Sequence, residues 1–226
     1  MRLLVLVVAG LSATACASLA SEGDRGSVRA SGGAKVETGA PYSGTFANGT
    51  GNIDITAADT GGRVTPLPPH DALSVNARVE ADGHVYEVRV REPAVGDPLG
   101  RFTTWWGVGV NVEHHGRSGI GSDKVPAVRS KLAAFGIGDV TVDGRPAAQG
   151  VLVHVMTMDN DMVELDVGDG VADPIDGLPQ RHLRVQWSGA AIDVPQAAHG
   201  ARYLLGAVVL LVSAGVMLAL NRRIAA

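Results

Sequence analysis

Histidine and methionine alternate in the segment HVMTMDND, which spans positions 154–161. Successive side chains of a β-strand point to opposite faces, so His154, Met156 and Met158 would point the same way. Imidazole and thioether groups together are ligands that copper prefers, Cu(I) above all. Further donors are available if their strands lie close: His114, His115 and Met162. The pattern therefore predicts a copper site formed by His154, Met156, Met158 and His114.

The same segment also has the pattern of a buried central strand. Leu152 shares a face with His154, and the opposite face carries Val151, Val153, Val155 and Thr157. A strand that is apolar on both faces is typical of a sheet interior, and methionine commonly fills gaps in protein cores. Under this interpretation, which the sequence favours, His154 is a single hydrogen-bonded histidine in a buried lining and no metal binds.

The pair His114-His115 is a second candidate. Neighbouring residues of a strand point to opposite faces, so both can ligate one metal only if the strand has ended. The residues that follow, 116–122, contain three glycines but resemble a phosphate-binding loop only loosely, because the required Lys-Ser/Thr does not follow. A solvated loop is the favoured interpretation of this segment.

An acidic run follows the histidine-methionine segment: Asp159, Asp161, Glu164, Asp166, Asp169 and Asp173. Carboxylates at this density suit calcium, but the spacing differs from an EF-hand loop, and Asp-Asn-Asp is typical of a turn. A solvated edge is therefore favoured. The sequence contains neither Gly-x-Ser-x-Gly nor His-Glu-x-x-His, so we do not expect an enzyme, although a hydrolytic triad assembled from distant residues stays open.

The first 17 residues have the order of an export signal: Arg2, an apolar run over 3–11, and then small residues. Two processing routes are open, cleavage at an A-x-A site and lipidation of Cys16. The small residues before Cys16 resemble a bacterial lipobox, although Ala13 stands where leucine is most common. Cys16 is the single cysteine of the chain, so the domain forms no internal disulfide.

Residues 203–220 carry no charge. As a helix they would extend about 27 Å, close to the thickness of the hydrocarbon core of a bilayer. We therefore expect a transmembrane helix over 201–221 and a cytoplasmic tail over 222–226.

The charges at this end predict the orientation. Arg222 and Arg223 agree with the positive-inside rule if the tail stays in the cytoplasm. Together with the export signal, this predicts a single-pass protein of the cell membrane with its domain on the periplasmic or extracellular side. A cleaved sorting signal is the alternative, because Val194-Pro195-Gln196 faintly resembles the start of an exosortase-type signal.

Composition divides the rest of the chain into a linker, a domain and a second linker. Residues 18–70 are small, polar and rich in glycine, serine and proline, which is typical of a flexible linker. Residues 71–188 form the expected domain, and 189–200 connect it to the membrane helix. The net charge of −4 indicates no basic face for nucleic acid.

Short runs with a period of two predict that the domain is all-β. The clearest hairpin has its turn at Asp82-Gly83, which pairs Val79 with Tyr86 on the apolar face and Arg78 with Glu87 on the polar face. Further strands are expected near 106–114, 140–142, 151–158, 163–167 and 183–187, and one short helix over 125–135. Seven or so short strands predict an immunoglobulin-like β-sandwich.

Together these features favour an exported, membrane-anchored β-sandwich that acts as a binding or envelope-support module. Its expected partners are the membrane and an envelope protein whose identity the sequence does not specify. The alternative function is a periplasmic copper-binding protein with histidine and methionine ligands.

Overall fold

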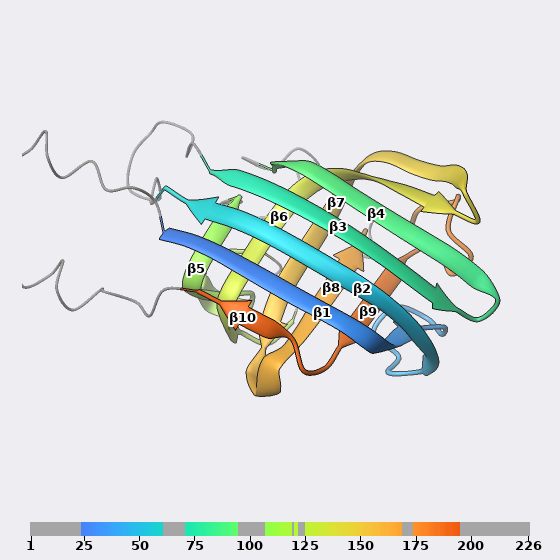
Figure 1. Ribbon diagram of the computed structural model, residues 1–226, viewed down its shortest axis with the longest axis horizontal. Helices are drawn as coiled ribbons and strands as arrows, with labels where there is room; N and C mark the ends of the chain where they lie inside the picture. Colours follow the sequence, from blue (N-terminus) through green and yellow to red (C-terminus); the bar gives the residue numbers. More distant parts are fainter. Residues whose placement is uncertain are drawn as a thin grey trace, which may run out of the picture. The chain divides into compact units, whose positions relative to one another are not determined.

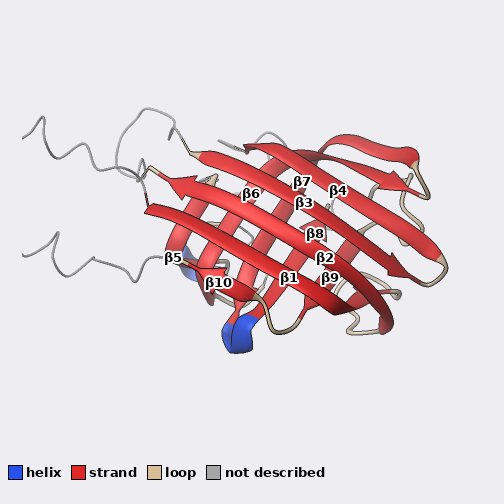
Figure 2. Ribbon diagram, viewed as in Figure 1, coloured by secondary structure: helices blue, strands red, loops and turns tan. Residues whose placement is uncertain are grey.

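The computed structural model describes residues 24–60, 71–94, 107–118, 120–121, 125–168 and 174–194, which form an all-β domain (Figures 1 and 2). The strands are β1 (Asp24–Glu37), β2 (Phe46–Asp59), β3 (Ala72–Ala81), β4 (His84–Pro93), β5 (Val108–His114), β6 (Val128–Val142), β7 (Arg145–Met158), β8 (Met162–Val167), β9 (Leu183–Trp187) and β10 (Ala191–Asp193). The described helical segments are two short 3-10 turns, η2 (Gly116–Ser118) and η3 (Asp159–Asp161).

Eight of these strands close into an antiparallel barrel. Their hydrogen-bonded order is β1-β2-β3-β4-β6-β7-β8-β9, and β9 pairs back onto β1 through Trp187 with Ala34 and Val185 with Val36. β5 lies beside the first half of β6, and β4 lies beside the second half. In Figure 1, β1–β4 form one wall and β6–β9 the opposite wall, with the strands of the two walls crossing. A barrel of this size is filled by its own side chains.

The all-β class is therefore confirmed, but the predicted immunoglobulin-like sandwich is wrong. A sandwich has two separate sheets, whereas here one sheet closes on itself through the pairing of β1 with β9. The error arises from residues 18–70, which were predicted to be a linker. β1 and β2 both come from this segment and pair along their whole length, from Asp24–Asp59 to Glu37–Phe46.

Two glycines of β2 reflect close packing of backbones rather than flexibility. A Cβ at Gly51 would overlap the carbonyl oxygen of Arg78 on β3, and a Cβ at Gly49 would overlap that of Glu80. Between them and the strand end, Ile53 and Ile55 alternate inward and are 1% exposed. The composition of a linker and that of a tightly paired strand were therefore indistinguishable here.

The predicted helix over 125–135 is also wrong, because this segment begins β6. Leu132 and Ala134 face the barrel interior, while Ala133 and Phe135 are buried on the outside. Four successive buried residues fit the period of a helix and that of a strand covered on both faces equally well. Pairing with β5 and β7 on either side selects the strand.

The predicted β3–β4 hairpin is confirmed in its register. Val79 pairs with Tyr86 and Val75 with Val90, as the two-residue turn requires. The turn residues have the positive φ angles of this turn type, 51° at Asp82 and 77° at Gly83. On the polar face, an Arg78 nitrogen lies 2.7 Å from a Glu87 oxygen.

Two separate apolar clusters are packed against the barrel wall. The first, here called the barrel core, fills the interior and includes residues of every strand of the ring. The second, here called the outer layer, lies against the outside of β6 and β7 and consists of Ala94, Val112, Ile120, Ala133, Phe135, Leu152 and Met156, with Ile137 and Met158 partly buried beside it. β7 serves both, because Val153 and Val155 point inward while Leu152 and Met156 point outward.

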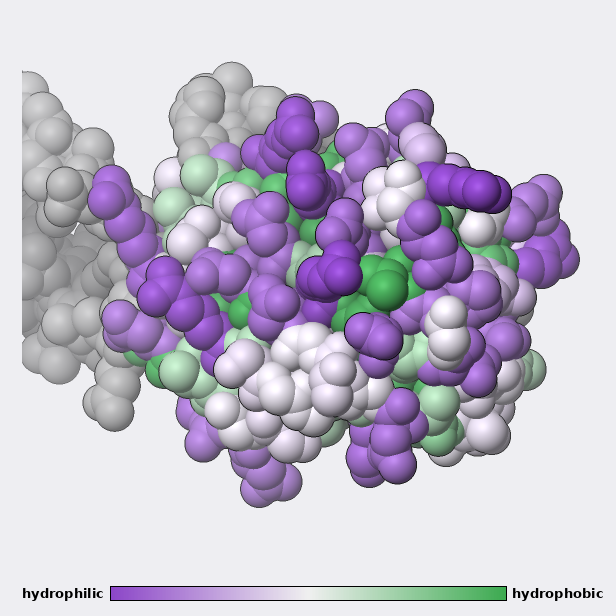
Figure 3. Space-filling model, turned by 45° about the vertical axis from the view of Figure 1, so that its right-hand side comes forward, coloured by the Kyte–Doolittle hydropathy of each residue, from purple (hydrophilic) through white to green (hydrophobic). Residues whose placement is uncertain are grey.

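The surface seen in Figure 3 is mostly hydrophilic, with apolar residues in small separate areas. Among the described residues, Tyr42 is the large hydrophobic side chain that is exposed, at 50%. The guanidinium carbon of Arg184 lies over the Tyr42 ring, 5.1 Å from the ring centroid.

The predicted export signal over 1–17 with Cys16, the predicted transmembrane helix over 201–221 and the tail over 222–226 all lie outside the described residues. None of the helices within the described ranges is long and apolar enough to cross a membrane. The predicted linker over 189–200 begins with a short strand, since Ala191–Asp193 form β10 and pair with Ser27–Arg29 of β1.

Candidate metal centre

The candidate site lies in the outer layer, where β7 presents His154 and Met156. Both side chains are on the face opposite to Val153 and Val155, as the period of two predicts. His154 is 8% exposed and Met156 is 7% exposed. The predicted strand buried on both faces is therefore confirmed, but the single hydrogen-bonded histidine predicted with it is not, because His154 lies beside two further histidines and its Nε2 has no hydrogen-bond partner.

His114 comes to this place from the end of β5. One strand, β6, lies between β5 and β7, since β5 pairs with β6 and β6 pairs with β7. Asn111 has a positive φ of 50°, which interrupts the alternation of faces within β5. Val110 before it belongs to the barrel core, whereas Val112 after it belongs to the outer layer, on the side where His114 lies.

His115 joins the site because the strand ends at His114. Its φ is 64°, a left-handed conformation that turns its side chain away from the alternation of the strand. Backbone hydrogen bonds hold this turn, from the N–H of His115 to the oxygen of Ile120 and from the N–H of Ser118 to the oxygen of His115. The condition under which two successive histidines can share a metal is thus fulfilled.

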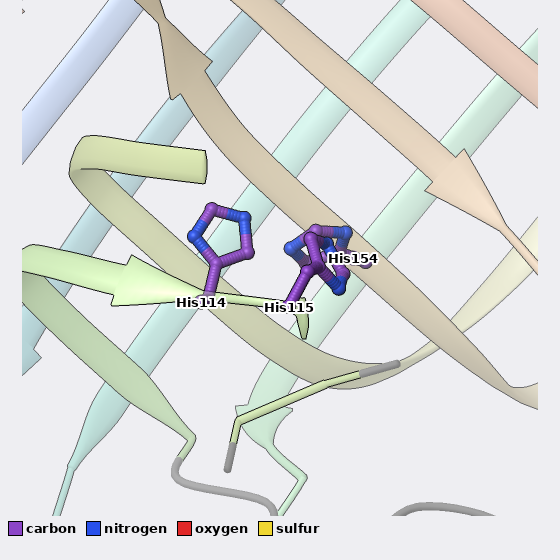
Figure 4. Close-up of side chains that lie close together, drawn as sticks. All are labelled: His114, His115 and His154. Carbon is purple, nitrogen blue, oxygen red and sulfur yellow. The ribbon is translucent and has the colours of Figure 1, made fainter. Parts of the chain in front are cut away.

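The three imidazole rings converge (Figure 4). Ring centroids are 4.4 Å apart for His114 and His115, 5.3 Å for His114 and His154, and 5.2 Å for His115 and His154. One nitrogen from each ring lies within 4.8 Å of the others. Met156 adds a sulfur, since its Sδ is 3.2 Å from Nε2 of His114.

Burial keeps the imidazoles of His114 and His154 neutral. Desolvation, assisted by the neighbouring His115, lowers the pKa of His114 to about 4. Desolvation, with the same effect from both other histidines, lowers the pKa of His154 well below its usual value. A neutral imidazole has a nitrogen lone pair available for a metal, whereas an imidazolium has none.

Two of the ring nitrogens are buried without a hydrogen-bond partner, Nδ1 of His114 and Nε2 of His154. A buried polar atom in this condition costs stability and calls for an explanation, of which an ion at a functional site is one. The ring of His154 is held flat against Phe135, with centroids 4.2 Å apart and planes 9° from parallel. Its Nδ1 faces the Asp166 carboxylate at 3.8 Å.

The donor set fits a transition metal. Metal–nitrogen bonds of about 2.0–2.1 Å place two ligand nitrogens about 3.3–3.5 Å apart, so the rings need only a modest contraction from their present spacing. Three imidazoles suit zinc or copper, and an added thioether favours copper, especially Cu(I). The group formed by His114, His115 and His154 can hold a metal ion.

The predicted ligands are thus brought together in part. His114, His154 and Met156 meet, and His115, which the sequence left conditional, joins them. Met158 is placed at the end of β7, opposite Met162 of β8, and packs at the margin of the outer layer. Gly116, which directly follows His115 with a φ of 55°, was the sequence signal that the strand had ended.

The acidic run does not assemble a group of three carboxylates within the described ranges. Asp161 pairs with Lys131 at 3.1 Å, and Glu164 accepts two hydrogen bonds from Arg184. Burial and the adjacent Glu164 raise the pKa of the Asp166 carboxyl, and Arg184 opposes that rise. Asp169 and Asp173 lie outside the described residues.

No protein-family model, curated protein or solved structure matches this chain. The case for a metal centre is therefore made by the geometry of the residues themselves.

Proposed function

We propose that this protein binds copper, as Cu(I), through His114, His115, His154 and Met156. The observation that carries the proposal is the convergence of three imidazole rings and a thioether in one buried place. Two of the ring nitrogens there have no hydrogen-bond partner. Because the pKa values of His114 and His154 are lowered, both imidazoles are uncharged at neutral pH. Each then has a nitrogen lone pair for the metal, with no proton to displace.

The choice of copper over zinc rests on Met156. Thioether sulfur is a soft ligand that binds Cu(I) and contributes little to zinc, which takes thiolate, imidazole or carboxylate. Met156 is 7% exposed and its sulfur contacts His114, which supports including it in the donor set. The partly exposed His115 is the ligand by which the ion would enter and leave.

We further propose that the domain works outside the cytoplasm, tethered by the predicted helix over 201–221. The support is the export-signal pattern of residues 1–17 and the uncharged segment 203–220. In this arrangement the copper-binding barrel stands at the membrane surface, where it holds or passes on copper. The test is fractionation: the full-length protein should sediment with membranes and be released only by detergent.

Cu(I) titration of the full-length protein tests the metal proposal. Under anaerobic, reducing conditions with a competing Cu(I) chelator, we expect one tightly bound copper per chain. His154→Ala should lower the affinity by more than the roughly 10–100-fold expected for loss of an outer partner. Met156→Leu keeps the side-chain volume and should weaken Cu(I) binding while leaving zinc binding unchanged.

A matched control is His84→Ala. His84 is a histidine of the same barrel that pairs with Asp143 at the surface, with its side chain 39% exposed. This variant should bind copper as the wild type does. Absence of stoichiometric copper binding in the wild type, or equal losses in His84→Ala and His154→Ala, would refute the proposal and leave a partner-binding envelope module as the better explanation.

A further inference from the structure

His154 has two ring nitrogens in different surroundings. Nδ1 faces Asp166 Oδ2 at 3.8 Å, and Nε2 is buried without a hydrogen-bond partner. The two residues are direct cross-strand neighbours, since His154 of β7 pairs with Asp166 of β8. Their relative position is therefore set by the barrel wall and not by a loop.

The Asp166 side chain is bordered by Arg184 of the next strand and by Glu164 of its own strand, with which it interacts directly. Arg184 of β9 is its cross-strand neighbour, with Nε 3.5 Å from Asp166 Oδ1. The same guanidinium donates two hydrogen bonds to Glu164, and Gln186 donates another to Glu164. The Asp166 side chain is 13% exposed, so water competes little for its contacts.

The plane of the His154 ring is restricted as well. Stacking on Phe135 opposes rotation of the imidazole about its Cβ–Cγ bond, because that rotation would turn the ring out of the stacked plane. A carboxylate on one side of the ring then decides which nitrogen carries the proton. An acceptor at Nδ1 favours the Nδ1–H tautomer and leaves the lone pair on Nε2.

We propose that Asp166 is the positioning residue of the metal centre: by accepting the Nδ1–H of His154 it presents the Nε2 lone pair to the ion. This inference rests on the proposed function and identifies a residue that does not itself touch the metal. The arrangement is a carboxylate–histidine–metal relay of the kind that raises the affinity of metal sites. The present distance of 3.8 Å is longer than a hydrogen bond, so the proposal requires the Asp166 side chain to approach Nδ1 by about 0.6 Å or more.

The first test is the tautomer of His154 in the metal-free protein. Nitrogen-15 NMR of the imidazoles in the full-length wild type should show His154 protonated at Nδ1. Protonation at Nε2 instead would overturn the proposal directly, with no variant and no metal needed.

The second test compares three variants in the Cu(I) titration. Asp166→Ala removes the acceptor and should abolish the Nδ1–H preference and weaken Cu(I) binding about 10–100-fold. Asp166→Asn keeps one oxygen and should restore part of both. Asp176→Asn removes an equal charge at the surface, where Asp176 pairs with Arg181 and its side chain is 89% exposed, and its affinity should stay within about 3-fold of the wild type.

The outcomes separate the two proposals. Equal losses in Asp166→Ala and Asp176→Asn would assign the effect to the loss of negative charge and overturn the positioning role. If the wild type binds no copper, the proposed function fails, while the tautomer measurement still decides whether Asp166 orients His154.

Discussion

The two faces of β7 and β8 differ in what they bury. Inward, Val153, Val155 and Leu165 are at most 1% exposed and contact only the barrel core. Outward, the same strands carry the buried His154 and Met156 and the partly buried Asp166, which are polar or polarisable. One side of the wall is therefore a hydrophobic interior, and the other is a layer of titratable groups covered from outside.

The difference indicates that stability and chemistry are assigned to separate sides of the same strands. Among the described residues, buried side-chain atoms without hydrogen-bond partners include His114 Nδ1, His154 Nε2 and Arg184 Nε, none of them in the barrel core. Trp187 Nε1 is the counterpart within the core. Unsatisfied buried polar atoms destabilise a fold, so their gathering beside a ligand cluster is expected of a functional site.

The largest effect should come from the interior face. Leu165→Ala removes a side chain with 0% exposure and should lower the free energy of unfolding by about 2–5 kcal/mol, because it leaves a cavity in the barrel core. Urea unfolding of the full-length protein at neutral pH measures this. A loss below about 1 kcal/mol would contradict the view that the interior carries the stability.

The next effect should appear on acidification and should come from the outer face. The pKa of His114 is about 4 in the folded protein and 6.5 in the unfolded chain. Between these two pH values the unfolded chain therefore binds more protons than the folded protein. Stability should therefore fall by about 3 kcal/mol as pH drops from 6.5 to 4, and His154 should add to the loss. The free energy of unfolding, measured across this pH range, should depend more steeply on pH in the wild type than in His114→Leu. Identical slopes would refute the assignment of this pH dependence to His114.

At neutral pH, His114→Leu should raise the stability of the metal-free protein by about 1 kcal/mol. The variant replaces an imidazole that has an unsatisfied nitrogen with an apolar side chain in a 0% exposed position. It should also lose tight Cu(I) binding. A marked destabilisation would show instead that the imidazole is a structural element of the outer layer.

The smallest effect should come from the solvated polar face of the β3–β4 hairpin. Arg78 and Glu87 lie 2.7 Å apart, but their side chains are 55% and 33% exposed. Arg78→Ala should change the free energy of unfolding by less than about 1 kcal/mol, because water screens the pair. A larger change, read from the same urea curves, would mean that the arginine stem packs more tightly than its exposure indicates.

Elements governed by local geometry were predicted well from the sequence. The β3–β4 register follows from a two-residue turn and the alternation of Val75, Ala77 and Val79, all within a few residues of one another. The barrel could not be predicted in the same way, because closure depends on Val36 meeting Val185, far apart in the chain. The glycines at 49 and 51 also gave no indication of their setting, because glycine is common both in flexible linkers and where two strands pack closely.

For the candidate site, too, the part that depends on local spacing was predicted, and the part that depends on contacts between distant segments was not. His154 and Met156 were identified by their spacing, and His114 as a donor that required its strand to be near. Met158 satisfied the spacing but lies one further step along β7, opposite Met162. His115 depends on a left-handed φ of 64°, a backbone conformation that the residue type alone does not indicate.

The sequence by itself determined which residues of each strand share a face, because a strand alternates wherever it lies. Only the tertiary structure decided which face became the interior, and that side chains at the end of β5 meet those of β7. Those outcomes depend on pairings between distant segments, and it is these pairings that place three histidines from two strands around one point.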